Sequence, residues 1–335
     1  MASKLRCAVI GAGRIGQIHA TNIAQRVAGA ELVAVADVRL DAARDLAARL
    51  NVPNVYADYR EAIALASVDT VVVCTPTSTH YDVIMAAAAR GLRIFTEKPV
   101  DLDLAKIDAI IAEVARRKVP FMVGFQRRYD PDFARMRAVV RDGGVGAVHV
   151  VRITSRDAVP PPESFIPTSG GLFLDMTIHD LDMVRFLTGS EVAGVYAKAT
   201  VLVDPMFARA GDVDTAVITL TLENGALACI DNSRKAVYGQ DQRAEVFGSS
   251  GMVSSANHVI DRVVRADEAG SHGSRLMSFF PERYADAYRL EMQAFVDLVQ
   301  AGRPMDVTGH DGRQAVAIAL AVQQSARDGR FVQLG

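Results

Sequence analysis

The sequence lacks an excess of charge of either sign. Its 37 lysine and arginine residues nearly balance 39 aspartate and glutamate residues, which leaves a net charge of −2. A protein that binds nucleic acid or an anionic membrane through its surface charge needs a positive excess. The composition therefore gives neither partner an electrostatic basis, and we expect neither.

Long apolar runs and cysteine clusters are also absent. No apolar run reaches the roughly 20 residues that a membrane span needs. The first apolar segment begins directly after Arg6, which leaves no room for a signal peptide. The three cysteines are scattered through apolar segments, as buried thiols are: Cys7, Cys74 and Cys229. We therefore expect a cytoplasmic protein with reduced thiols.

A glycine fingerprint follows the first predicted strand. Gly11, Gly13 and Gly16 form the pattern Gly-x-Gly-x-x-Gly between the apolar run 7–10 and a helical pattern. In this context the first glycine permits a tight turn, the second lets a pyrophosphate approach, and the third allows close helix packing. A second strand ends at Asp37, about 20 residues further on, where the fingerprint requires an acid. The stretch predicts a dinucleotide site.

Asp37 also bears on the choice of cofactor. A carboxylate at this place accepts hydrogen bonds from the ribose hydroxyls and repels a 2′-phosphate, which favours NAD over NADP. Arg39 could contact a phosphate, so NADP stays open. Because ligands of such sheets lie at the carboxyl ends of strands, we predict these cofactor-binding residues: Gly11, Gly13, Arg14, Ile15, Asp37, Val38, Arg39, Thr75, Pro76, Thr77, His80, Glu97, Lys98 and Gln126.

The pattern of predicted secondary structure changes near Gly124. Before it, short apolar strands alternate with alanine-rich helices, which predicts right-handed βαβ units. After it, strand runs such as 215–222 and 226–233 are joined by a hairpin turn at 223–225. We predict an α/β protein with two domains. Residues 1–124 form an NAD-binding Rossmann domain with a doubly wound parallel sheet. Residues 125–335 form an α+β domain for substrate binding and oligomerisation, with a large, mostly antiparallel open sheet.

Motifs along nearly the whole chain resemble the Gfo/Idh/MocA oxidoreductase family, and the later ones look most like its inositol 2-dehydrogenase branch. In chain order they are CTPTSTH at 74–80, EKP at 97–99, VGFQRRYD at 123–130, GGLFLDMTIHDLD at 170–182, NSRKAVYGQDQR at 232–243, FFPERYADAYRLE at 279–291 and TGHDG at 308–312. The resemblance implies a catalytic lysine, aspartate and histidine, here Lys98, Asp175 and His179. It also implies a dimer or tetramer formed through the outer face of the second sheet.

The residues support this set independently. A helical pattern over 172–187 puts Asp175 and His179 four residues apart on one face, with Asp182 two turns from Asp175. Histidine titrates near neutrality and suits a base that takes a hydroxyl proton. We predict that His179 accepts the proton while Asp175 orients the ring or joins a relay. Lys98 would stabilise the developing alkoxide.

A ring of hydroxyls needs several polar partners. The predicted substrate-binding residues are Lys98, Arg127, Asp175, His179, Asp182 and Tyr238. Arg127 and Arg128 could instead pair with Asp130 or Asp132. The H-E-x-x-H pattern is absent. Four further histidines show no partner at metal-ligand spacing, and we predict no metal: His19, His258, His272 and His310.

The predicted function is NAD-dependent oxidation of a cyclic polyol, myo- or scyllo-inositol, to the corresponding inosose. A dehydrogenase of a glucose- or galactose-type pyranose is the first alternative. The second alternative is a glycosidase, because some members of the family use tightly held NAD for glycosidic cleavage. A nucleotide-sensing subunit is a third, although a sensor has no need of the proton acceptor His179.

Overall fold

The computed structural model describes residues 3–335, which divide into two compact units. Unit 1 runs to Tyr129 and takes in Asp286–Val316, and unit 2 comprises Asp130–Ala285 and Ala317–Gly335. The division by function into 1–124 for the cofactor and 125–335 for the substrate stays a prediction. The compact units have other bounds because a late segment of the chain returns to unit 1.

Six parallel strands form the sheet of unit 1, in the order β3-β2-β1-β4-β5-β6. Their bounds are β1 (Leu5–Ile10), β2 (Ala30–Ala36), β3 (Asn54–Tyr56), β4 (Thr70–Val73), β5 (Arg93–Glu97) and β6 (Phe121–Gly124). The order reverses between β1 and β4, which is the point where doubly wound sheets bind ligands. The four residues of β4 are completely buried, as a strand covered on both faces requires. The predicted parallel sheet is confirmed.

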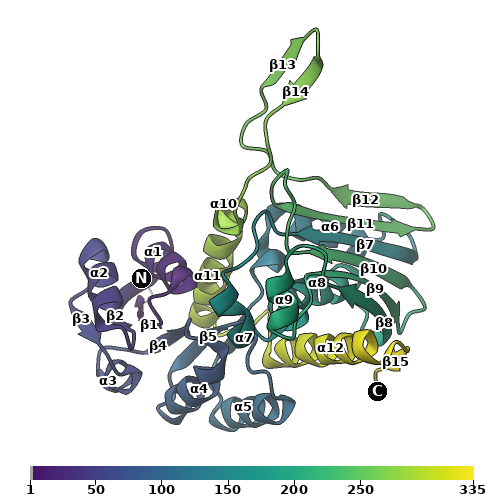
Figure 1. The fold of residues 1–335 in the computed structure, drawn as a ribbon. Helices are drawn as coiled ribbons and strands as arrows, with labels where there is room; N and C mark the ends of the chain where they lie inside the picture. Colours follow the sequence, from purple (N-terminus) through teal and green to yellow (C-terminus); the bar gives the residue numbers. More distant parts are fainter. Residues whose placement is uncertain (1–2) are drawn as a thin grey trace. The chain divides into compact units, whose positions relative to one another are not determined.

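Helices connect these strands (Figure 1). They are α1 (Arg14–Gln25), α2 (Leu40–Leu50), α3 (Tyr59–Ala64), α4 (His80–Ala89) and α5 (Leu104–Arg117), with short 3-10 helices η1 (Thr77–Thr79) and η2 (Gln126–Tyr129). Asp58 and Asp103 cap α3 and α5 by accepting backbone N–H bonds at 2.8 Å. Unit 1 also holds most of α11 (Ala285–Gln300) and the first part of α12 (Gly309–Asp328).

Seven strands form the sheet of unit 2, in the order β12-β11-β7-β10-β9-β8-β15. Their bounds are β7 (Val148–Arg156), β8 (Val192–Thr200), β9 (Thr215–Leu222), β10 (Leu227–Ser233), β11 (Asp241–Gly248), β12 (Gly251–Ser255) and β15 (Val332–Gln333). β7 and β10 pair in parallel, and the other neighbours pair antiparallel. The predicted, mostly antiparallel sheet is confirmed.

The two faces of this sheet differ. Ile218, Leu220 and Ile230 lie on the inner face and are buried. Figure 1 shows α8 (Ile178–Thr188) and α12 beside the sheet, and the side chain of Ser325 on α12 accepts the backbone N–H of β8 at 3.0 Å. The other helices of unit 2 are α6 (Pro131–Arg141), α7 (Ile166–Ser169), α9 (Pro205–Arg209) and α10 (Phe280–Arg283), with the 3-10 helix η3 (Glu163–Phe165). On the outer face, Val217 and Leu227 are each 52% exposed.

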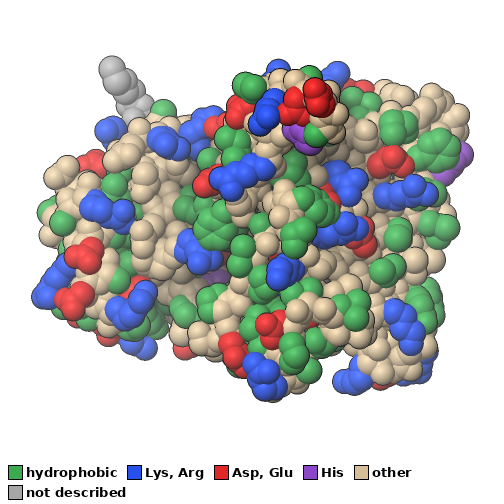
Figure 2. All heavy atoms as spheres, turned by 45° about the horizontal axis from the view of Figure 1, so that its top comes forward, with side chains coloured by type: hydrophobic (Ala, Val, Ile, Leu, Met, Phe, Trp, Pro, Cys, Tyr) green, Lys and Arg blue, Asp and Glu red, His purple; other side chains and the backbone are tan. Residues whose placement is uncertain are grey.

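A two-stranded hairpin stands off from the sheet of unit 2 (Figure 1). Its strands are β13 (Val264–Asp267) and β14 (Gly270–Gly273), and all of their residues are exposed. Its surface carries acidic and basic side chains, and Arg265 pairs with Asp267 at 2.8 Å. Figure 2 shows that acidic and basic side chains are mixed over this face of the molecule. The hairpin therefore contributes nothing to the core of unit 2.

The helix predicted over 172–187 is interrupted. It begins with the π-helical turn η4 (Phe173–Thr177) and continues as α8. The Thr177 hydroxyl donates to the Asn232 side-chain oxygen at 2.6 Å and lies 3.3 Å from the carbonyl of Leu172, five residues earlier. These contacts stabilise the wider turn. The predicted helix over 172–187 is therefore present, but its first part is a π-turn that the sequence pattern did not predict.

None of the helices in the described part of the chain is long and apolar enough to cross a membrane.

Candidate active site

The glycine turn after β1 has the geometry that the fingerprint predicts. Gly11 has a φ of +103°, and a Cβ on it would lie 2.5 Å from the Cys74 carbonyl oxygen. A Cβ on Gly16 would lie 1.8 Å from the carbonyl oxygen of Gly11. Around Gly13 no atom lies within 4 Å of such a Cβ. Two of the glycines are thus required by packing, whereas Gly13 leaves open space beside the start of α1.

The start of α1 is suited to an anion. No side chain caps this helix, and its first turn holds no acidic residue but contains Arg14 and Ile15. Asp37 braces the turn, because its two oxygens accept the backbone N–H groups of Ala12 at 2.7 Å and Arg39 at 2.8 Å. The neighbouring Val38 is 89% exposed. These residues fit a dinucleotide, with backbone N–H groups for the pyrophosphate and Asp37 for the ribose.

Polar atoms without protein partners lie at the next strand ends. One is the hydroxyl of Thr75, which lies just after β4, and the other is the side-chain oxygen of Gln126, which lies just after β6. Both atoms are buried and have no hydrogen-bond partner among the residues that the structure describes. Thr75 leads through Pro76 into η1, which begins at Thr77. Because buried polar atoms are normally satisfied, these atoms fit a bound polar ligand such as the predicted cofactor.

His80 joins two strand-end segments. Its ring is 1% exposed, with Nδ1 2.9 Å from the Pro99 carbonyl oxygen and Nε2 2.8 Å from that of Thr75. Burial lowers the pKa of this ring, while the two carbonyl groups act in the opposite direction. The contacts give His80 a role in holding the segments after β4 and β5 together. Its contact with a cofactor stays a prediction.

Glu97 belongs to a buried cluster that sequence spacing does not reveal. Its Oε1 lies 2.7 Å from His19 Nε2, and one ligand atom from each of His19, Glu97 and Glu291 lies within 4.8 Å of the others. Burial, and then the charges of both glutamates, raise the pKa of the Cys74 thiol well above its usual value. Sequence spacing could not reveal these partners of His19, because they come from distant elements, and the expectation of no metal stays a prediction. Lys98 follows Glu97 directly and is half-buried.

The predicted proton acceptor lies in unit 2, at the start of α8. His179 is 9% exposed, and Asp175 belongs to the π-turn one turn earlier. The backbone N–H of Leu172 donates to the Asp212 carboxylate at 3.0 Å, which holds the beginning of this segment. Four apolar residues of the same helical segment are buried: Leu174, Ile178, Leu181 and Val184.

Two residues near Asp175 were not singled out from the sequence. Arg234 donates from Nη2 to Asp175 Oδ2 at 3.0 Å and from Nη1 to Asp157 Oδ2 at 3.3 Å. Arg234 lies in the motif 232–243, so that motif carried a signal for it. Asp157 directly follows β7 and had none, because its partner is distant in the sequence.

The three residues predicted to bind the substrate hydroxyls that do not react have different surroundings. Arg127 and Asp182 are buried, and Asp182 Oδ1 lies 3.8 Å from Arg185 Nη1. The Tyr238 hydroxyl donates to Asp241 Oδ2 at 2.7 Å and accepts from Arg156 Nη1 at 3.0 Å. Burial, and then the hydrogen bond to Asp241, raise the pKa of Tyr238. All three roles stay predictions.

The suggested arginine–carboxylate pairs have other partners. Arg128 binds Asp311 at 2.9 Å instead of Asp130 or Asp132. Asp130 accepts from Arg283 at 2.5 Å, and Asp132 lies 2.6 Å from His258 Nε2. Neither carboxylate is therefore the partner of Arg128. Pairings between residues this far apart in the chain leave no sequence signal.

The cysteines are free thiols, and burial raises the pKa of Cys7 to about 12. The prediction of reduced thiols agrees with this state.

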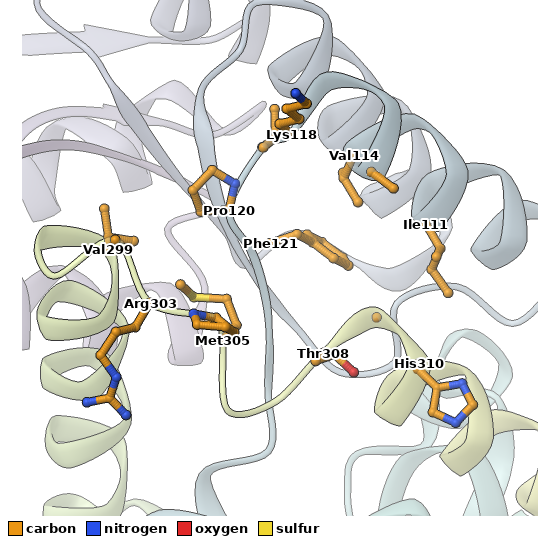
Figure 3. A pocket seen from close by; sticks show the side chains of 15 residues that line it. Ile111, Val114, Lys118, Pro120, Phe121, Val299, Arg303, Met305, Thr308 and His310 are labelled. Atoms are coloured by element: carbon orange, nitrogen blue, oxygen red, sulfur yellow. The ribbon is translucent and has the colours of Figure 1, made fainter.

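One hollow in unit 1 lies away from the predicted residues. It has a volume of about 490 Å³ and includes Pro120 and Phe121, at the amino end of β6, together with Met305 (Figure 3). Cofactors of doubly wound sheets bind at the carboxyl ends of strands. This hollow is therefore not the candidate active site.

Comparison with known proteins agrees with the geometry. Residues 5–125 match an oxidoreductase family with an NAD-binding Rossmann fold, and residues 133–254 match the Gfo/Idh/MocA C-terminal domain. The chain is 46% identical over 330 residues to the myo-inositol 2-dehydrogenase of Thermotoga maritima, with 98% of each chain covered. It is 42% identical to an inositol 2-dehydrogenase of Rhizobium meliloti, over 98% of this chain and 99% of that one.

A solved structure has the same fold over the full length. The scyllo-inositol dehydrogenase of Lactobacillus casei, solved with bound NAD(H) and scyllo-inositol, matches with a TM-score of 0.93 at 31% identity, covering 99% of both chains. The family matches, these relatives and the glycine turn with its acid at Asp37 lead to one conclusion: the chain belongs to the Gfo/Idh/MocA oxidoreductases and carries their NAD-binding Rossmann fold.

Proposed function

We propose that this protein is an NAD-dependent inositol dehydrogenase that oxidises one secondary alcohol of myo- or scyllo-inositol to the corresponding inosose. The observation that carries the proposal is the 46% identity to a myo-inositol 2-dehydrogenase along nearly the whole of both chains. Lys98, Asp175 and His179 stand at the matching motif positions of this sequence.

The chain's own residues divide the proton chemistry. His179 accepts the hydroxyl proton, because a neutral imidazole is a competent base near neutral pH. Asp175 orients the ring, and Lys98 stabilises the negative charge that develops on the oxygen. When bound, NAD supplies the nicotinamide carbon that accepts the hydride of the carbinol carbon. Arg127, Asp182 and Tyr238 bind the hydroxyls that do not react.

The first test is NADH formation. Purified protein is supplied with NAD or NADP and with myo-inositol, scyllo-inositol, glucose, galactose and their lactones, and absorbance at the NADH band is followed. We expect turnover with an inositol and NAD. In Lys98→Ala the kcat should fall by about 100-fold or more, since loss of one preorganised hydrogen-bond donor to a developing oxyanion lowers the rate by this factor. Lys118→Ala, on the far end of α5, is the control and should behave like the wild type.

Each alternative gives a different result in this assay. A pyranose dehydrogenase would produce NADH with a sugar but not with inositols. A glycosidase that retains its NAD would cleave a nitrophenyl glycoside without net NADH. A sensor would bind NAD and turn over none of the substrates. Unchanged NADH formation by Lys98→Ala would refute the assigned chemistry.

We also propose that copies of the chain associate through the outer face of the sheet in unit 2. Its exposed large side chains come from five strands: Tyr196, Val217, Leu227, Phe247 and Met252. Exposed apolar side chains gathered on one sheet face, here together with charged ones such as Arg152 and Glu245, fit a protein interface. A two-fold pairing of this face with itself would cover them.

A further inference from the structure

Arg234 lies between two carboxylates in the interior of unit 2. It directly follows β10 and is 3% exposed. One guanidinium nitrogen donates to Asp175 and the other to Asp157, at 3.0 and 3.3 Å. A buried cation in this position is bound on both sides, and removing it would leave carboxylates without their counter-charge.

The main chain and the second carboxylate hold Arg234 in place. The N–H of Arg234 donates to the Asp214 carbonyl at 2.9 Å, and that of Asp157 donates to the Ser233 carbonyl at 2.9 Å. Gln240 donates to the second oxygen of Asp157 at 3.2 Å. Because the guanidinium also binds this braced Asp157, rotation of Asp175 away from it would break the contact, which favours one orientation of the Asp175 carboxylate.

The Arg234 guanidinium also stays positively charged. Burial by itself lowers the pKa of the guanidinium, but the charges of Asp175 and Asp157 outweigh it and raise the pKa above its usual value. A permanent cation at hydrogen-bond distance favours the ionised form of a carboxyl group. An ionised carboxylate accepts hydrogen bonds and has no proton to donate.

We propose that Arg234 is a positioning residue that holds Asp175 as an oriented carboxylate, so that His179 alone exchanges the proton with the alcohol. The inference rests on the proposed function, in which His179 is the base. It decides between the two roles that the sequence left open for Asp175, orientation and relay, in favour of orientation.

Three variants separate charge, geometry and fold. Arg234→Gln removes the cation. Arg234→Lys keeps the charge but loses the two-sided contact. Arg283→Lys is the matched control, because Arg283 is also buried, 5% exposed, and binds an aspartate of the same unit, Asp130, at 2.5 Å.

We expect kcat of Arg234→Gln to fall by about 10- to 100-fold, as for the loss of a hydrogen bond to a charged group. The acid limb of its pH profile should move up by about one pH unit, because proton uptake becomes easier once the cation is gone. Arg234→Lys should lose less activity than Arg234→Gln, and the acid limb of its pH profile should stay at the wild-type position. Arg283→Lys should change the thermal midpoint without moving the limb.

Titration of the His179 imidazole by ¹⁵N NMR tests the same inference without substrate. Its midpoint should rise in Arg234→Gln and stay near the wild-type value in Arg234→Lys and Arg283→Lys. An unmoved midpoint in Arg234→Gln would overturn the inference even if inositol is the substrate. If Arg234→Gln does not fold, Arg234→Lys provides the test. The inference would be overturned if the His179 midpoint moves in Arg234→Lys while this variant loses no more activity than Arg283→Lys. A wild type inactive on every inositol would refute the proposed function alone, since the NMR result still stands.

Discussion

The ion pair between Arg128 and Asp311 joins the turn η2 to the first turn of α12 within unit 1. Burial by itself raises the pKa of the Asp311 carboxyl, but the charge of Arg128 and the hydrogen bonds from Thr308 outweigh it and hold the pKa at about 2. Since the folded pKa lies below the unfolded value near 4, this carboxylate stabilises the fold above about pH 4. That stability is lost as the pH falls from about 4 to 2.

Asp311→Asn should therefore lower the free energy of unfolding by about 2 kcal/mol at pH 7. The difference from the wild type should shrink as the pH falls toward 2, because both proteins then carry a neutral side chain. Urea titrations at pH 7 and pH 3 measure it. Asp108→Asn is the control, because its pair with Arg313 is at the surface and contributes little. A pH-independent difference for Asp311→Asn would contradict the assignment.

Among single residues, those with local functions were predictable. Gly11 and Gly16 are required by contacts with the next strand or turn, and these contacts follow from the fingerprint. The partners of Arg128 and His19 were not predictable. Their partners lie 183 and 78 residues away, and nothing in the local sequence specifies them.

At the scale of elements, the π-turn η4 is the feature with the clearest test. Thr177→Val would remove the hydroxyl that bonds to Asn232 and leave a buried amide oxygen without its donor. We expect a loss of about 1–3 kcal/mol in the free energy of unfolding and a fall in kcat, because Asp175 belongs to the same turn.

Chemical denaturation together with steady-state kinetics measures both effects. Thr188→Val is the matched control on the same helix, because its hydroxyl bonds the carbonyl four residues earlier at 2.7 Å in an ordinary α-helical arrangement. If the two variants lose the same stability and both keep their activity, the π-turn does not matter for the site.

The strands and helices were predictable because period and turn residues are local signals. The strand 215–222 has the predicted bounds. The π-turn was not predictable, because a single wide turn hardly disturbs the apolar pattern of the segment, and the contact that accompanies it, Thr177 with Asn232, joins residues 55 positions apart. The parallel pairing of β7 with β10 was equally hidden, because these strands lie far apart in the chain and no sequence pattern specifies which distant strands pair.

At the scale of the whole molecule, the outer sheet face predicts an assembly. Val217→Asp combined with Leu227→Asp places two like charges on this face, and burial of unpaired charge is costly. We expect a lower mass by light scattering after size exclusion, with NAD binding retained. Val263→Asp, on the segment that leads into the hairpin, is the control and should leave the mass unchanged. A monomeric wild type would refute the proposed interface.

The hairpin of β13 and β14 has a different consequence. Every residue from 261 to 273 is exposed, so a substitution there opens no cavity and costs no packing energy. The segment is therefore free to drift in sequence and length without any effect on the folding of unit 2. Gly270 has a reason of its own to stay fixed, because its φ of +125° favours glycine. Any other position that evolution holds fixed would be held by a contact beyond the unit itself. In a set of relatives, restricted variation in this hairpin would thus record the existence of a binding partner.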